Sequence, residues 1–524
     1  MKRNKLRLAA LLLALAMLLC GCVAGDGLVH YKLMKYERPD MTAVRQTLED
    51  ACSAAEGEDV DAVLEAVYHF YDTYDWFYTC SALADIRYCS DLTDSYWEQE
   101  SNFCAQNSAD VDAALEELYY ALAQSPCRQE LEAEFFGEGF FESYDGENLW
   151  DAEFTDMLVR EAQLQSRYYA LSEQSLAYEY GTDDYYDACA GDMAQLLVEL
   201  IALRQELAAY WGYSDYLQFA WDFYYYRDYT PSQAGALLEQ IRQELVPLYR
   251  QMSGSGVWDA SYEPCPEKET LAYVRRAAKN MGGTVAEAFK VLEAAGLYDI
   301  AYGENKYNSS FEIYLTSYWE PFIFMNSTLT AYDQLTLAHE FGHFCNDYAS
   351  YGSYVGVDVS EVFSQGMEYL SLCYGQNTQA LTRVKMADSL NTYVEQAAFA
   401  SFEQQMYGLS GEALTVENLY SLYDTVARSY GFDSVGYDRR EFVDITHYYT
   451  NPLYIISYVV SNDAAMQLYQ LEQEERGAGL RLYEDNLTTQ ESYFLSFLDS
   501  AGLESPFSPG RIQKVKKTLT DILQ

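Results

Sequence analysis

Apolar side chains recur three and four positions apart along most of this chain, which is the spacing that lines one face of an α-helix. The pattern predicts helices over Ala62–Phe70, Asp110–Ala123 and Ala194–Tyr210. The run Thr230-Pro-Ser-Gln233 predicts the start of another helix, because it joins an N-cap threonine, a proline at the first helical position and a capping-box glutamine. Only 10 prolines and 30 glycines interrupt the 524 residues. The expected fold class is therefore mostly α.

The pattern changes between residues 311 and 325. Phe311, Ile313 and Leu315 alternate with polar residues, and Pro321–Met325 is a short apolar run. Both are typical of strands, so we expect a small sheet, placed beside the helix that carries His339 and His343. The exposed edge of such a sheet can bind an extended peptide through backbone hydrogen bonds.

The main candidate for chemistry is His339-Glu340-Phe341-Gly342-His343. On a helix, His339 and His343 share one face and can bind one metal ion, while Glu340 can accept a proton from water as a general base. Such a motif also arises by chance, and the alternative is a solvated helix face with two incidental histidines. Two observations favour a zinc site: the chain has only five histidines, and apolar residues flank the string, so the helix should be buried.

The first 21 residues have the pattern of a secretory signal. Four basic residues precede an apolar run over Leu8–Leu19, which is too short for a permanent membrane helix. The run ends in Leu19-Cys-Gly-Cys22, which resembles a bacterial lipoprotein cleavage box with Cys22 as the lipid acceptor. Diacylglycerol on Cys22 would anchor the chain outside the cytoplasmic membrane. Plain secretion after cleavage is the alternative.

The charge balance is strongly acidic. Without the signal, 29 basic side chains face 81 acidic ones, a balance of −52. Such a field repels nucleic acid and anionic lipid headgroups, so we expect neither as a partner and expect membrane contact only through the lipid anchor. The charge serves solubility, or it attracts cationic substrates.

Several motifs together resemble one peptidase family. Pro321–Asn326 followed by Thr336–His343 carries the resemblance, and further matches lie at Leu203–Leu207, Gly212–Tyr216, Asp228–Pro231, Val246–Leu248, Ser360–Gln365 and Phe402–Tyr407. The sequence resembles the M3 family of zinc peptidases, the thimet oligopeptidase and oligoendopeptidase F group, and fits the oligoendopeptidase F branch better. The resemblance is strong over residues 195–470 and only architectural before them. It implies a two-lobed helical body of zincin type, with a deep channel and one zinc ion on the channel wall.

The resemblance also suggests the third zinc ligand. Family members supply a glutamate from the helix after the histidines, and Glu361 matches that motif. The loop between His343 and Glu361 is shorter than usual in the family, and Glu368 lies at a more usual distance along the chain. We prefer Glu361 because loops absorb changes of length. Gln365 and Glu368 are then expected to orient a ligand by hydrogen bonding.

Related peptidases place a histidine and one or two tyrosines over the zinc, where they stabilise the oxyanion. The matching segment here contains His447, Tyr454 and Tyr458. The two tyrosines are four positions apart and can face one way. Their offsets from His447 do not match every branch of the family, so the identity of the donor stays open. An aromatic segment packed in the core is the alternative.

The expected function is zinc-dependent hydrolysis of short peptides by a monomer anchored outside the cytoplasmic membrane. One rival is an M1-type aminopeptidase, although no Gly-x-Met-Glu-Asn motif precedes the histidines. The other is a peptide-binding surface lipoprotein that does not catalyse, although a binder has no need of Glu340. The predicted organisation is a lipoprotein signal peptide (1–21), a tether (22–39), an N-terminal helical lobe (40–190) and a peptidase catalytic region (191–524).

Overall fold

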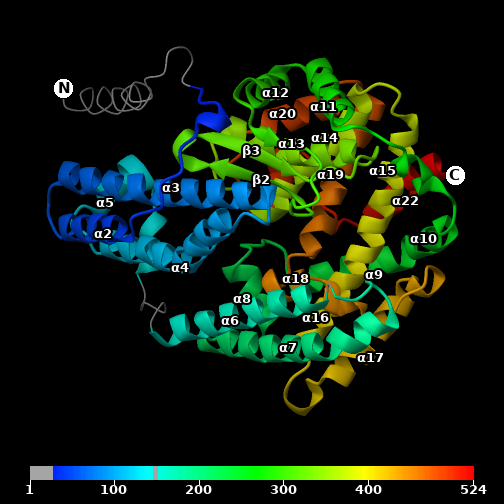
Figure 1. The fold of residues 1–524 in the computed structure, drawn as a ribbon, viewed down its shortest axis with the longest axis horizontal. Coiled ribbons are helices and arrows are strands. Elements are labelled where there is room, and N and C mark those ends of the chain that lie inside the picture. The colour runs from blue at the N-terminus through cyan, green and yellow to red at the C-terminus, as the bar shows by residue number, and fades with distance from the viewer. Residues whose placement is uncertain (1–27, 146–151, 176) are drawn as a thin grey trace. The chain divides into compact units, whose positions relative to one another are not determined.

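The computed structural model describes residues 28–145, 152–175 and 177–524. The predicted signal peptide and Cys22 lie outside these residues. Helices make up most of the fold, as predicted (Figure 1). In chain order, the first helices are η1 (Tyr31–Leu33), α2 (Met41–Ala55), α3 (Val60–Ser90), α4 (Ser95–Ala123), α5 (Arg128–Leu131), η2 (Glu132–Phe136), η3 (Phe140–Tyr144), α6 (Ala152–Ser175), α7 (Asp183–Tyr210), α8 (Tyr216–Phe223), α9 (Pro231–Glu244), α10 (Val246–Met252), η4 (Val257–Tyr262), α11 (Glu267–Met281) and α12 (Gly283–Ala295).

Three strands, a short helical turn and the remaining helices follow α12. These are β1 (Tyr298–Asp299), β2 (Ser310–Leu315), η5 (Thr316–Tyr318), β3 (Glu320–Met325), α13 (Asp333–Ser350), α14 (Val357–Tyr374), α15 (Gln379–Asn391), η6 (Thr392–Gln396), α16 (Ala397–Met406), η7 (Gly411–Ala413), α17 (Val416–Ser429), η8 (Phe432–Ser434), η9 (Glu441–Asp444), α18 (His447–Thr450), α19 (Ile456–Glu474), α20 (Ala478–Asn486), α21 (Phe494–Ala501) and α22 (Arg511–Leu523). No helix among the described residues is long and apolar enough to cross a membrane.

The chain folds into two compact units that alternate along the sequence. Among the described residues, the first unit combines those up to 142 with 282–327 and 347–352, and the second combines those within 143–281, 328–346 and 353–524. The predicted division into a lobe ending at residue 190 and a catalytic region beginning at 191 stays a prediction.

The predicted helices form, and the local sequence shows why. Asp59 caps α3 by accepting a hydrogen bond from the Ala62 amide, so the helix begins close to the predicted residue 62. At α9, Thr230 and Gln233 form the expected capping box, with Pro231 in the first turn. The stretches predicted at 62–70 and 110–123 extend into the longer helices α3 and α4, because no proline or glycine interrupts those helices.

The two predicted strands form as β2 and β3, and with β1, which was not predicted, they make a three-stranded sheet in the first unit with the order β1-β3-β2. β2 and β3 run antiparallel, with Phe311 opposite Phe324, and β1 pairs with β3 in parallel. The apolar run of β3 is buried from Pro321 to Met325, as expected of a central strand. β2 is an edge strand of this sheet.

Tyrosine hydroxyls donate to carboxylates at many places in the fold. Examples with hydrogen bonds of 2.8–3.0 Å are Tyr229 to Asp358, Tyr249 to Glu395, Tyr332 to Asp388 and Tyr374 to Glu472. The sequence holds 51 tyrosines and only 33 lysines and arginines. Tyrosine therefore supplies many of the donors that buried and half-buried carboxylates need in a chain with few cations.

Within the second unit, helices α13 and α14 pack unusually close together at Gly342. A Cβ atom at this position would lie 2.4 Å from the backbone oxygen of Phe363 and 2.6 Å from Cα of Ser364. No side chain fits at such distances, so the approach of the two helices requires glycine.

We expect Gly342→Ala to lower the free energy of unfolding by about 1–3 kcal/mol, because the added methyl group forces the two helices apart. Gly191→Ala is the matched control. Gly191 is exposed within α7 with no atom near its would-be Cβ, so alanine there should stabilise the helix by roughly 0.5–1 kcal/mol. Thermal and urea unfolding measure both changes, and equal stabilities for the two variants would contradict the packing argument.

Candidate metal centre

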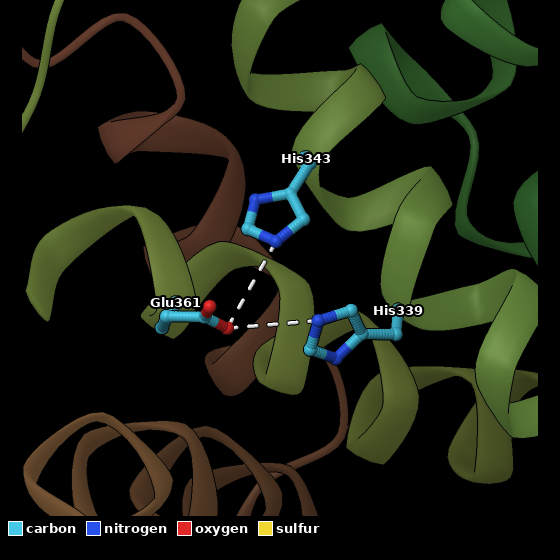
Figure 2. A group of neighbouring side chains, drawn as sticks. All are labelled: His339, His343 and Glu361. Carbon is cyan, nitrogen blue, oxygen red and sulfur yellow. Dashed lines mark ion pairs between the residues drawn. The ribbon is translucent and has the colours of Figure 1, made fainter. Parts of the chain in front are cut away.

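α13 and α14 bring His339, His343 and Glu361 together (Figure 2). One Glu361 oxygen, Oε2, lies 3.6 Å from His339 Nε2 and 3.9 Å from His343 Nε2. One possible ligand atom from each residue lies within 4.8 Å of those of the other two. Two imidazole nitrogens and a carboxylate oxygen converging on one point form a donor set that fits a divalent transition-metal ion.

Hydrogen bonds hold Glu361 in this position. Ser364, one turn further along α14, donates to Oε2 at 2.9 Å. Tyr454 donates to the other oxygen, Oε1, also at 2.9 Å. The Glu361 side chain is buried, and these two donors fix its orientation.

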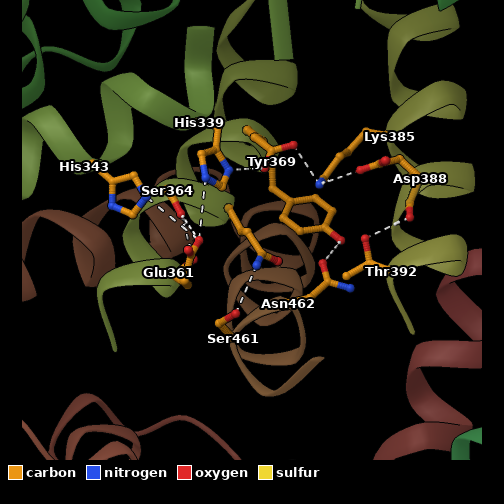
Figure 3. A network of polar contacts seen from close by, with 12 residues as sticks. His339, His343, Glu361, Ser364, Tyr369, Lys385, Asp388, Thr392, Ser461 and Asn462 are labelled. Atoms are coloured by element: carbon orange, nitrogen blue, oxygen red, sulfur yellow. Dashed lines mark hydrogen bonds and ion pairs between the residues drawn. The ribbon is translucent and has the colours of Figure 1, made fainter. Parts of the chain in front are cut away.

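The histidines are held through the ring nitrogens that face away from Glu361. His339 Nδ1 lies 2.9 Å from Glu368 Oε1, and His343 Nδ1 lies 3.2 Å from Ser360 Oγ. Both Nε2 atoms are left to face Glu361 (Figure 3). This is the arrangement expected of metal-binding histidines, whose second nitrogen is held by a carboxylate or another polar group. The structure thus groups Glu361, rather than Glu368, with the two Nε2 atoms.

A buried lysine supports Glu368 in turn. Lys385 Nζ lies 2.7 Å from Glu368 Oε2 and 3.1 Å from Asp388 Oδ2. Sequence reasoning missed Lys385, although a lysine directly between the apolar residues Val384 and Met386 is a sign of a buried ion pair. Gln365, by contrast, donates to Ser461 on α19 and not to a ligand.

Burial and charge shift the pKa values of these groups in different directions. Burial alone would lower the pKa of His339, but Glu368 and the carboxylates of Glu361 and Glu340 outweigh it and raise that pKa to about 9. Burial lowers the pKa of His343 to about 4. For Glu361, burial works against the charged form, but the two histidines prevail and lower its pKa. The carboxylate is therefore ionised at neutral pH and ready to bind a cation.

Glu340 lies in the same electrostatic environment. It is buried on α13, next to His339 in sequence. Its charge helps to raise the pKa of His339 and also that of Tyr458. A carboxylate so close to the three clustered residues is in place to move a proton there.

His447, Tyr454 and Tyr458 gather in one aromatic group beside Glu361. Their ring centres lie 5.2–5.8 Å apart, and His447 Nε2 is 3.3 Å from the Tyr458 hydroxyl. Burial raises the pKa of both tyrosines, so their hydroxyls stay protonated and can donate. Burial lowers the pKa of His447, which favours its neutral form.

The neighbouring Tyr448 and Tyr449 belong to the core instead. Both side chains are fully buried, and their hydroxyls donate to the backbone oxygens of Phe399 and Met193. Arg204, which lies in a motif of the family resemblance, donates to the backbone oxygens of both tyrosines. This buried arginine anchors α18, and the sequence alone did not reveal that role.

Comparison with known proteins adds a domain match. Residues 31–147 match the Peptidase M3 N-terminal domain. No curated protein matches the chain. The match falls in the region where the sequence itself shows no short motif of the family. A domain of long helices is defined by apolar positions spread over its whole length rather than by a short motif.

Solved structures share the fold over almost the whole chain. A protein solved as an oligoendopeptidase F matches with a TM-score of 0.80 and 20% identity, and PZ peptidase A with an inhibitor matches with 0.78 and 19%. A protein of Bacillus anthracis strain Ames, also solved as an oligoendopeptidase F, matches with 0.76 and 20%. Each match covers 94% of this chain and 98% of the other. The domain match and the shared fold support an M3 peptidase family.

The two glutamates should differ in their effect on metal affinity. Glu361→Ala removes an atom of the donor set itself, so we expect the larger loss. Glu368→Ala removes only the group that holds His339 Nδ1, and losses at such positions are about 10- to 100-fold. Competitive titration with Zn²⁺ and a chelator measures both affinities. A larger loss for Glu368→Ala would transfer the ligand role to that residue.

Proposed function

We propose that this chain is a zinc-dependent M3 endopeptidase that hydrolyses short peptides. The observation that carries the proposal is the cluster of His339, His343 and Glu361, with Glu340 on the same helix as both histidines. The M3 N-terminal domain match and the fold shared with oligoendopeptidase F structures support it independently of the cluster.

The side chains divide the chemistry between them. His339, His343 and Glu361 would hold the zinc ion, which supplies a Lewis acid that polarises the peptide carbonyl and acidifies water. The Glu340 carboxylate takes a proton from the attacking water and passes it to the leaving amine. Protonated donors from the group of His447, Tyr454 and Tyr458 stabilise the negative charge that develops on the carbonyl oxygen.

Glu340→Gln tests the proposed function directly. Glutamine keeps the size of the side chain and cannot accept the proton, so we expect zinc content to stay at the wild-type level while turnover falls about 100-fold or more. An internally quenched peptide and metal analysis provide the two measurements. A peptide-binding protein without catalysis would show no turnover in the wild type either, and an aminopeptidase would require a free substrate amine.

The aromatic group should act mainly in the transition state. We expect His447→Ala, and phenylalanine at Tyr454 or Tyr458, to raise the activation free energy by about 3 kcal/mol. Both kcat and kcat/KM then fall together, while KM and zinc content stay nearly unchanged. Tyr449→Phe is the control, because its hydroxyl donates to a backbone oxygen in the core. If Tyr449→Phe lowers kcat as much as the others do, the effect arises from packing.

We also propose that diacylglycerol on Cys22 holds the protein at the outer face of the cytoplasmic membrane. The proposal rests on the signal pattern that ends in Leu19-Cys-Gly-Cys22. Cys22→Ala should accumulate as an unprocessed precursor or leave the membrane fraction. Normal processing and unchanged membrane association, measured by fractionation and immunoblotting, would contradict the anchor.

A further inference from the structure

The segment between α18 and α19 carries Tyr454, whose hydroxyl donates to Glu361 Oε1 at 2.9 Å. The residue before it, Leu453, has φ of +66°. Side chains other than glycine rarely adopt this left-handed conformation, and a leucine persists in it only where the surrounding structure holds it. Leu453 is also buried, with 2% of its surface exposed.

Two side chains from other parts of the second unit hold the backbone of Leu453. Glu403 Oε1, on α16, accepts a hydrogen bond from the Leu453 amide at 2.6 Å. Arg227 Nη1, just after α8, donates to the Leu453 carbonyl at 2.9 Å. Both side chains are buried, so water does not compete for these bonds. The peptide groups on both sides of Leu453 are therefore fixed in direction.

Arg227 also ties this segment to the helix that carries Glu361. Its Nε lies 3.2 Å from Oδ2 of Asp358, which precedes Glu361 by about one turn of α14. Its Nη2 donates at 2.9 Å to Ser457 in the first turn of α19. One guanidinium thus sets the position of the Leu453 carbonyl relative to α14, and its planar fork has the geometry for several simultaneous bonds.

We propose that Glu403 and Arg227 are positioning residues that place the Tyr454 hydroxyl against Glu361 by holding Leu453 in its left-handed conformation. The catalytic part of this inference rests on the proposed peptidase function. Neither residue has a hydrogen bond or ion pair to His339, His343 or Glu361 among the contacts of the described residues. The effect of Glu403 on turnover therefore passes through the Leu453–Tyr454 backbone, whereas Arg227 also acts on α14 through Asp358.

Glu403 offers the sharper pair of variants. Glu403→Met keeps the length of the side chain and removes the acceptor for the Leu453 amide. Glu403→Gln keeps an acceptor, and it mimics the native group well because burial raises the pKa of Glu403 to about 8. Gln404→Met on the same helix is the matched control, since the Leu453 amide donates to Glu403 and no hydrogen bond joins Gln404 to Leu453 among the described residues.

Kinetics with an internally quenched peptide form the first test. We expect Glu403→Met to lower kcat roughly 10- to 100-fold with little change in KM or zinc content, because a displaced catalytic group loses about that much. Glu403→Gln and Gln404→Met should stay near the wild type. In a Tyr454→Phe background, Glu403→Met should cost less than about twofold, because the hydroxyl it positions is already absent. Fully additive losses would overturn the proposal.

A second readout does not depend on catalysis. With 3-fluorotyrosine at position 454, the ¹⁹F resonance should shift in Glu403→Met and stay in place in Gln404→Met. This result would stand even if the chain hydrolysed no peptide, so failure of the positioning role and failure of the proposed function are distinguishable. An unchanged resonance in Glu403→Met would overturn the positioning role.

A milder variant covers the case in which Glu403→Met does not fold. The Tyr225 hydroxyl donates to the backbone oxygen of Pro452 at 2.7 Å and so holds the same segment from another side. Tyr225→Phe removes only this bond. We expect the same pattern on a smaller scale: a shifted Tyr454 resonance and a loss of kcat that disappears in the Tyr454→Phe background. A loss that persists there would contradict the proposal.

Discussion

The close approach of α13 and α14 at Gly342 is the constraint on which the candidate site depends. The two histidines lie on α13 and the clustered glutamate lies on α14, so the distance between the helices sets the distances between their side chains. That distance is short only because residue 342 has no Cβ. A residue between two candidate ligands in the sequence thus acts through backbone packing rather than through chemistry.

Buried charged side chains hold the residues around this contact in place. Lys385 holds Glu368, Glu368 holds His339, and Arg227 joins Asp358 to the segment before Tyr454. Lys385, Glu368, Arg227 and Asp358 are each buried beside a charged partner, and removing one member of a pair would leave the other uncompensated. The arrangement therefore resists small displacements, which suits a site whose side chains must keep fixed distances.

The sequence predicted the parts of this site that depend on local spacing. The helix with His339, Glu340 and His343, the strands near residues 311–325 and the capping box at Thr230 all follow from patterns within a few positions. The family motif also selected Glu361, which the structure places with both histidines. By contrast, Arg227 and Leu453 are 226 positions apart, and no local periodicity reports a contact at that separation. The left-handed backbone of Leu453 was equally hidden, because leucine gives no sequence signal for that conformation.

The many hydrogen bonds from tyrosine to carboxylates have a consequence for the whole molecule. A tyrosine hydroxyl satisfies a carboxylate without bringing a positive charge beside it, so the excess of carboxylates behind the formal net charge of −48 is not offset locally at these positions. The carboxylates repel one another across the surface, while the hydrogen bonds that hold them are local and little affected by ions. Dissolved salt screens the repulsion between carboxylates but hardly weakens the hydrogen bonds from tyrosine. Moderate ionic strength therefore favours the compact state of this protein. A fold stabilised mainly by surface ion pairs is instead weakened by salt.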